Sequence, residues 1–111
     1  MSDGGVMNTE TFLCRAADVP DGGALKIERA GRPPLAVFNV GGRFFVTDDT
    51  CTHGEASLSE GEIDADECVV ECPWHSGAFD LATGKPCGAP CTIALKIHAF
   101  ECRDGALYLL G

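Results

Sequence analysis

Two cysteine–histidine pairs are the residues of this 111-residue chain that are best suited to chemistry. Cys51 and His53 form a CxH pair, and Cys72 and His75 form a CxxH pair after the intervening residues 54–71. Thiolates and imidazoles are soft or borderline ligands that bind zinc, copper and iron–sulfur clusters. The doubled pattern therefore predicts a metal site built from two hairpin-like loops.

Two kinds of metal site satisfy this pattern. Two thiolates and two imidazoles can bind one tetrahedral zinc ion, or they can hold a 2Fe–2S cluster with the thiolates on one iron and the imidazoles on the other. The spacing alone leaves both open. Nearby glycines and prolines favour the cluster, because inorganic sulfides need backbone amides to approach closely. They are Gly54, Pro73, Gly77, Gly84, Gly88 and Pro90.

The elements that must position these residues have the pattern of β-strands. Short β-rich runs recur along the chain, and Gly41-Gly42 and Asp104-Gly105 provide the positive φ angles of tight hairpin turns. The expected strands are TFLCRA (11–16), ALKIER (24–29), LAVFNV (35–40), RFFVTD (43–48), CVVEC (68–72), TIALKIHAFEC (92–102) and ALYLL (106–110). No run of residues has a convincing helical stripe, and ASLSEGEID (56–64) is the one candidate for a short helical turn.

An all-β fold follows from this pattern. We expect a small antiparallel β-sandwich or barrel base that carries an inserted, loop-rich lobe from about residue 50 to 90. Residues 1–8 are predicted to form a loose tail and residues 9–111 a single domain, because the chain is too short for a second one.

The motifs around the two pairs closely resemble the cluster-binding lobe of Rieske proteins. CTHG, CPWHSGAFD and TGKPCGAP carry this resemblance. From about residue 11 to 110 the chain is most similar to the Rieske ferredoxins of multicomponent aromatic-ring-hydroxylating dioxygenases, including carbazole, cumate and naphthalene-type systems. CTHGEASLSEG, GAFDLATGKP and PLAVFNV account for most of that similarity. The resemblance implies one Rieske 2Fe–2S cluster, with Cys51 and Cys72 on one iron and His53 and His75 on the other.

The resemblance also implies an electron carrier and its partners. The chain would take single electrons from a flavin-dependent NAD(P)H ferredoxin reductase and pass them to a terminal oxygenase, docking near His53 and His75. It would not itself be an enzyme, since no catalytic triad, phosphate-binding loop or dinucleotide motif is present. One alternative is the small Rieske subunit of an NAD(P)H nitrite reductase, and another is a zinc-stabilised interaction module without a redox role.

Four positions bear on the reduction potential within this resemblance. High-potential Rieske proteins have an extra disulfide whose cysteines correspond to Ala56 and Trp74, and hydroxyl donors to cluster sulfur that correspond to Gly77 and Phe79. None of these groups is present here. We therefore expect a potential near the low end of the Rieske range, on the order of −150 mV.

The remaining cysteines and the third histidine have simpler interpretations. Cysteine in β-rich or glycine- and proline-rich runs commonly packs as a small hydrophobe, and this is expected of Cys14, Cys68, Cys87, Cys91 and Cys102. Cys87 and Cys91 could alternatively complete a four-thiolate site with Cys51 and Cys72. His98 is expected on a polar strand face, in solvent.

The charge of the chain limits its partners. Seventeen acidic and eight basic residues give a net charge of −9, which disfavours nucleic acid and anionic membranes. No export signal or membrane-spanning apolar run is present, so we expect a cytoplasmic monomer. Acidic residues near the ligand pairs are expected to steer basic partner surfaces. They are Asp48, Asp49, Glu55, Glu60, Glu62, Asp64, Asp66, Glu67 and Glu71.

Overall fold

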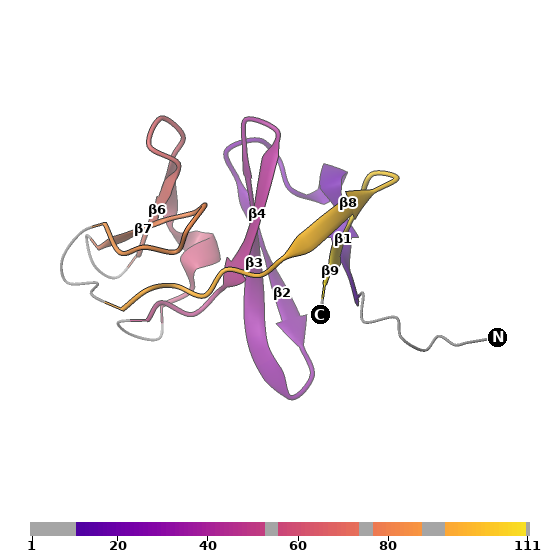
Figure 1. Cartoon of the computed structure of the whole chain (residues 1–111), viewed down its shortest axis with the longest axis horizontal. Coiled ribbons are helices and arrows are strands. Elements are labelled where there is room, and N and C mark those ends of the chain that lie inside the picture. Colours follow the sequence, from indigo (N-terminus) through magenta and orange to yellow (C-terminus); the bar gives the residue numbers. More distant parts are fainter. Residues whose placement is uncertain (1–10, 53–55, 74–76, 88–92, 111) are drawn as a thin grey trace.

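The computed structural model describes residues 11–52, 56–73, 77–87 and 93–110, which form three small antiparallel sheets (Figure 1). The sheet orders are β1-β9-β8, β2-β3-β4 and β5-β6-β7. The elements are β1 (Thr11–Arg15), η1 (Ala16–Asp18), β2 (Ala24–Arg29), β3 (Arg32–Val40), β4 (Arg43–Asp48), η2 (Leu58–Glu60), β5 (Glu62–Asp64), β6 (Val69–Glu71), β7 (Ala78–Asp80), β8 (Phe100–Arg103) and β9 (Ala106–Leu109). The predicted all-β class is confirmed.

Strand β3 separates two hydrophobic cores. Residues 35–40 are all buried, and their side chains alternate between the two faces of the sheet. Ala36 and Phe38 pack in one core, whereas Leu35 and Val37 pack in the other. A continuous apolar run is the pattern expected of a strand that is covered on both faces.

The two cores belong to two parts of the molecule. The base core lies between β2-β3-β4 and β1-β9-β8 and includes Leu13, Val46 and Leu107. The lobe core lies on the other face of β3, where Val70 and Phe79 of the β5-β6-β7 sheet pack. Figure 1 shows the central sheet between the lobe at one end and the β1-β9-β8 sheet at the other.

Both predicted hairpin turns are confirmed. Gly41 and Gly42 join β3 to β4 with φ angles of 63° and 90°, and Asp104 and Gly105 join β8 to β9 with φ angles of 54° and 77°. Two-residue turns with positive φ at both positions match the twist of the flanking strands. These turns fix the register at Val40↔Arg43 and Arg103↔Ala106.

The long strand predicted over 92–102 is mostly wrong. Only β8 is a strand in this region, and residues 93–99 run as an extended strap beside the edge of β4. The backbone of Asp48 donates to Lys96 O at 3.0 Å, and His98 donates to Val46 O at 2.8 Å. The apolar–polar alternation of this run thus belongs to a segment that is held to the edge of a sheet by a few backbone hydrogen bonds, and not to a long strand. The 93–99 strap joins the base to the lobe.

Candidate metal centre

The two predicted ligand loops have equivalent backbone geometry. In the first, Thr50 and Ser57 form a β-bridge, and the Cys51 amide donates to Ala56 O at 3.0 Å. In the second, Glu71 pairs with Ala78, and the Cys72 amide donates to Gly77 O at 2.8 Å. Each cysteine therefore opens a short loop that is closed five residues later. His53 and His75 fall within these two loops in the sequence, but they lie outside the described residues.

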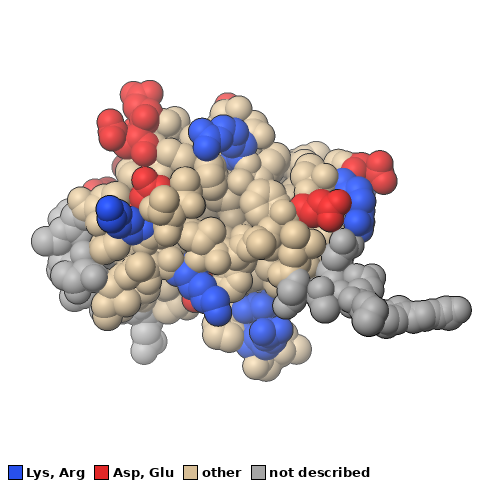
Figure 2. Space-filling model, viewed as in Figure 1, with Lys and Arg blue, Asp and Glu red and all other residues tan. Residues whose placement is uncertain are grey.

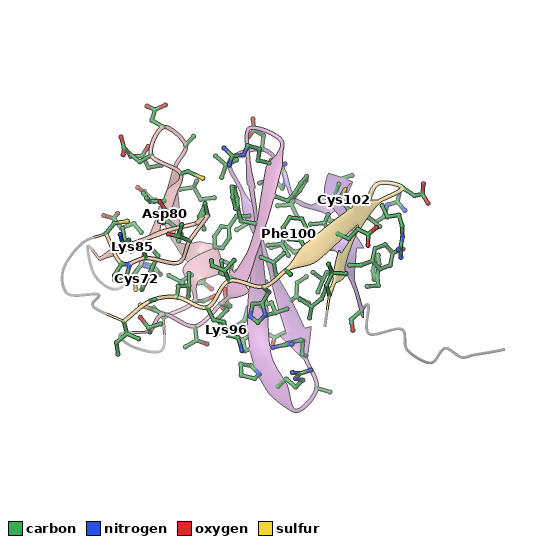
Figure 3. All side chains as sticks on the ribbon, viewed as in Figure 1. Cys72, Asp80, Lys85, Lys96, Phe100 and Cys102 are labelled. Atoms are coloured by element: carbon green, nitrogen blue, oxygen red, sulfur yellow. The ribbon has the colours of Figure 1, made fainter. Side chains whose placement is uncertain are left out.

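The two loop cysteines are buried together. Cys51 and Cys72 are 3% and 1% exposed and belong to the lobe core, with Phe79 in the same core. Figure 3 places Cys72 at the tip of the lobe. Thiolates are soft ligands, so two of them on separate loops at one site suit a 2Fe–2S cluster or a zinc ion. The two thiols present here therefore fit the thiolate ligands of a Rieske cluster.

A buried carboxylate anchors the first loop. Asp49 is 1% exposed; it accepts hydrogen bonds from the Ser57 hydroxyl and, at 2.9 Å, from the Ser59 amide. Its backbone carbonyl also accepts from the Leu58 amide at 2.7 Å. Lys26 Nζ of β2 lies 3.9 Å from the carboxylate. Asp49 thus holds η2 to the end of β4, and its prediction as a steering charge is wrong because its side chain is enclosed.

Close backbone contact ties the strap to the lobe at Gly84. The Leu95 amide donates to Gly84 O at 2.7 Å. A Cβ on Gly84 would lie 2.0 Å from Leu95 O, and φ is +81°. The glycine was expected to allow amides close to a cluster, but the structure shows that it makes room for the strap.

A hydroxyl group that the sequence reasoning missed links the first ligand loop to the same strap. Thr52 lies between Cys51 and His53 in the sequence, and its Oγ1 donates to Ile93 O at 2.8 Å. A threonine in a Cys-Thr-His motif carries no signal of a partner so distant in the chain. The bond fixes the first loop against the strap.

The prediction that the other cysteines are packed is only partly correct. Cys14 is buried in the base core, where burial and the nearby Asp18 carboxylate raise the pKa of its thiol. Cys68 packs against the lobe core, and burial raises its thiol pKa. Cys87 and Cys102 are exposed, because they lie at the surface of the lobe and on the edge strand β8. Cys91 lies outside the described residues.

The environment of His98 also differs from expectation. Its side chain is 15% exposed, and Nε2 lies 2.7 Å from Asp48 Oδ1. The strap brings this histidine against the end of β4, where it forms a partly buried polar pair instead of extending into solvent. The contact with Asp48 holds the strap against the end of β4.

Comparison with known proteins identifies the class of this site. The model of the Rieske 2Fe–2S domain matches residues 9–99. Ferredoxin CarAc of Metapseudomonas resinovorans is 48% identical over 99 residues, covering 89% of this chain and 91% of that protein. The 3-phenylpropionate/cinnamic acid dioxygenase ferredoxin subunit of Photorhabdus laumondii is 43% identical over 101 residues, covering 91% and 93%.

Solved structures agree with these relatives. The complex of reduced oxygenase and oxidised ferredoxin in carbazole 1,9a-dioxygenase contains a chain with a TM-score of 0.85 and 46% identity, covering 92% of this chain and 93% of that one. Likeness to a putative nitrite reductase small subunit is at 20% identity and shows a shared fold alone. The fold and site thus define a protein that holds one Rieske 2Fe–2S cluster. Within that class, the chain belongs to the Rieske ferredoxins, the electron-transfer subunits of aromatic-ring dioxygenase systems.

Proposed function

We propose that this chain carries single electrons from a flavin-dependent NAD(P)H reductase to a terminal aromatic-ring-hydroxylating oxygenase. The observation that carries the proposal is the pair of equivalent loops opened by Cys51 and Cys72, whose thiols share one buried core. In this proposal Cys51 and Cys72 bind one iron of the cluster, and His53 and His75 bind the other. A bound cluster would accept and release one electron without a change of bonding at the protein.

The surroundings of the ligand loops favour a low reduction potential. Phe79 is fully buried in the lobe core and has no hydroxyl to donate to sulfur, and Gly77 has no side chain. Hydrogen bonds to cluster sulfur stabilise the reduced state, so their absence lowers the potential. We expect a midpoint on the order of −150 mV by spectroelectrochemistry. A midpoint above zero would be incompatible with this carrier role.

The surface of the lobe suits basic partners. Between Arg43 and Lys85 the sequence contains no lysine or arginine. Exposed acidic residues gather on the β5–β6 hairpin and its flanks, where Figure 2 shows a red patch. They are Glu60, Glu62, Asp64, Asp66, Glu67 and Glu71. Such a patch accelerates encounter with a basic surface at low ionic strength.

We further propose that the carrier acts as a cytoplasmic monomer. Transient docking requires a freely diffusing molecule, and a net charge of −9 opposes self-association. Within the described residues, no helix is long and apolar enough to cross a bilayer.

A single-turnover experiment tests the proposed function. Chemically reduced protein is mixed in a stopped-flow instrument with the oxidised oxygenase of carbazole 1,9a-dioxygenase, and reoxidation is followed by absorbance. We expect rapid electron transfer that slows as ionic strength rises, because salt screens the acidic patch. A reduced cluster that does not transfer electrons would contradict the assignment of the acceptor, whereas transfer that is insensitive to salt would contradict steering alone.

A further inference from the structure

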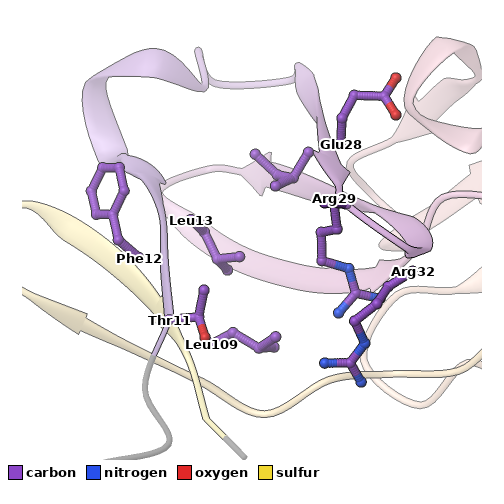
Figure 4. A pocket seen from close by; sticks show the side chains of 9 residues that line it. Thr11, Phe12, Leu13, Glu28, Arg29, Arg32 and Leu109 are labelled. Atoms are coloured by element: carbon purple, nitrogen blue, oxygen red, sulfur yellow. The ribbon is translucent and has the colours of Figure 1, made fainter.

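A groove opens on the side of the base that is remote from the ligand loops. It lies between β1 and the β2–β3 hairpin, and it encloses about 340 Å³. Leu13 and Leu109 of the base core line it, and Phe12, which is 56% exposed, stands beside them (Figure 4). The groove thus offers an apolar surface away from the lobe.

Two open strand edges border this groove. Residues 11–13 of β1 and 27–30 of the β2–β3 hairpin all line it. Successive strand side chains point to opposite faces, so a groove lined by consecutive residues runs along the backbone edge. In the part of the chain that the structure describes, β1 is paired only with β9 and β2 only with β3. Each strand therefore presents edge donors and acceptors that an added strand can use.

Two arginines give the groove a positive end. Arg29 and Arg32 lie directly opposite each other across the β2–β3 hairpin. Two like charges in such a position destabilise the strand pair. Arg29 Nε donates to Pro33 O at 2.9 Å, and neither guanidinium has an acidic partner among the described residues. The neighbouring Glu28 lies 3.5 Å from Lys26 Nζ, and Figure 4 shows its carboxylate pointing away from both arginines.

We propose that this groove binds an extended acidic segment of a partner protein. The segment would pair with an open strand edge, place carboxylates on Arg29 and Arg32, and lay apolar side chains against Leu13 and Leu109. Arginine binds carboxylates through two parallel hydrogen bonds, which suits it to this role. Binding here leaves the ligand loops accessible to another protein.

Fluorescence anisotropy of a labelled peptide tests this inference on the cluster-loaded protein. The probe is a fluorescein-labelled peptide of alternating glutamate and valine, and its counterpart has lysine in place of glutamate. We expect the acidic peptide to bind in a way that depends on Arg29 and Arg32. The basic peptide can be attracted only by the acidic patch of the lobe, so its affinity should not fall in the Arg29→Glu/Arg32→Glu variant. The Arg29→Glu/Arg32→Glu double variant should weaken binding at least about tenfold, since two charge-assisted contacts become repulsive.

The matched control is the Arg15→Glu/Arg43→Glu double variant. It makes the same change of net charge with exposed arginines that do not line the groove, and it should leave the affinity within about twofold. An equal loss in both double variants would overturn the proposal in favour of unspecific charge attraction. Equal affinity of a backbone N-methylated acidic peptide would overturn strand addition. A concentration-dependent dimer that only Arg29→Glu/Arg32→Glu abolishes would assign the groove to a second copy instead.

Discussion

The two cores on either side of β3 differ in what holds them together. The base core is almost entirely aliphatic and is closed by strands of four to nine residues. The lobe core has three-residue strands and contains Cys51 and Cys72, and the buried Asp49 links the lobe to the base. Apolar burial alone can stabilise the base. We expect the lobe to depend on its loop contacts and on the bound cluster, because metal binding energy adds to folding energy. The core expected to stabilise the fold and the core expected to hold the cluster thus lie on opposite faces of β3.

Among substitutions that distinguish the lobe from the base, the largest loss of stability is expected at Gly84. In Gly84→Ala the new Cβ would meet Leu95 O, so we expect the strap to detach from the lobe at a cost above about 4 kcal/mol. Gly22 is the matched control in the base, because its φ of +79° is similar but nothing lies within 4 Å. Gly22→Ala should cost only about 1–2 kcal/mol. Urea unfolding, followed by circular dichroism and by cluster absorbance, measures both. Equal costs would contradict the close contact.

Truncation of a large core side chain should have the next largest effect, and this effect should differ between the lobe and the base. Phe79→Ala should destabilise by about 3–5 kcal/mol and also reduce iron content, because its ring packs in the core that contains Cys51 and Cys72, the proposed thiolate ligands. Leu107→Ala should cost about 2–5 kcal/mol with an unchanged cluster spectrum, since Leu107 lies in the base core. Iron analysis and visible absorption distinguish these outcomes. Equal iron loss in both variants would show that the cores are one unit.

A smaller loss of stability is expected at Asp49, which links the end of β4 to η2. Asp49→Ala leaves the Ser59 amide and the Ser57 hydroxyl without their acceptor, which should cost about 1–3 kcal/mol. The exposed Asp66→Ala is the control and should change stability by less than about 0.5 kcal/mol. Thermal unfolding of the cluster-loaded proteins measures the difference. Identical stability of the two variants would mean that Asp49 does not anchor the first loop.

The smallest perturbation is thiol labelling, which should leave stability unchanged. Cys102 is exposed and should react quickly with iodoacetamide at neutral pH. Cys14 should react slowly, because it is buried and its raised pKa keeps the thiol protonated. Mass spectrometry after timed quenching measures both rates. Faster labelling of Cys14 than of Cys102 would contradict the packing of the base core.

Much of the base follows from local sequence patterns. ALKIER and RFFVTD coincide with β2 and β4, because their lengths and flanking turns set their limits. The ligand motifs predicted that Cys51 and Cys72 bind one iron, and the structure places both cysteines in the lobe core. Their role as ligands stays a prediction. Three-residue lobe strands such as β5 are too short for any periodicity to reveal.

Features that depend on distant partners could not be predicted from the sequence. Nothing in the sequence around Asp49 distinguishes it from an exposed acidic residue. Its burial is explained by Ser57 and Ser59, which follow it in the chain and bind its carboxylate. His98 finds Asp48 only because the 93–99 strap runs beside β4. Cys102 ends a run that resembles a core strand, and Cys87 lies in a run rich in glycine and proline, but both are exposed at the surface.

The ligand set is the central claim and is tested most directly by electron paramagnetic resonance of the dithionite-reduced protein, with iron and zinc quantified on the same sample. We predict a 2Fe–2S signal with an average g below that of all-cysteine ferredoxins. His53→Ala and His75→Ala should lose or alter this signal, and His98→Ala should retain it. An all-thiolate signal, equal effects of the three substitutions, or stoichiometric zinc without a signal would contradict mixed ligation by Cys51, Cys72, His53 and His75.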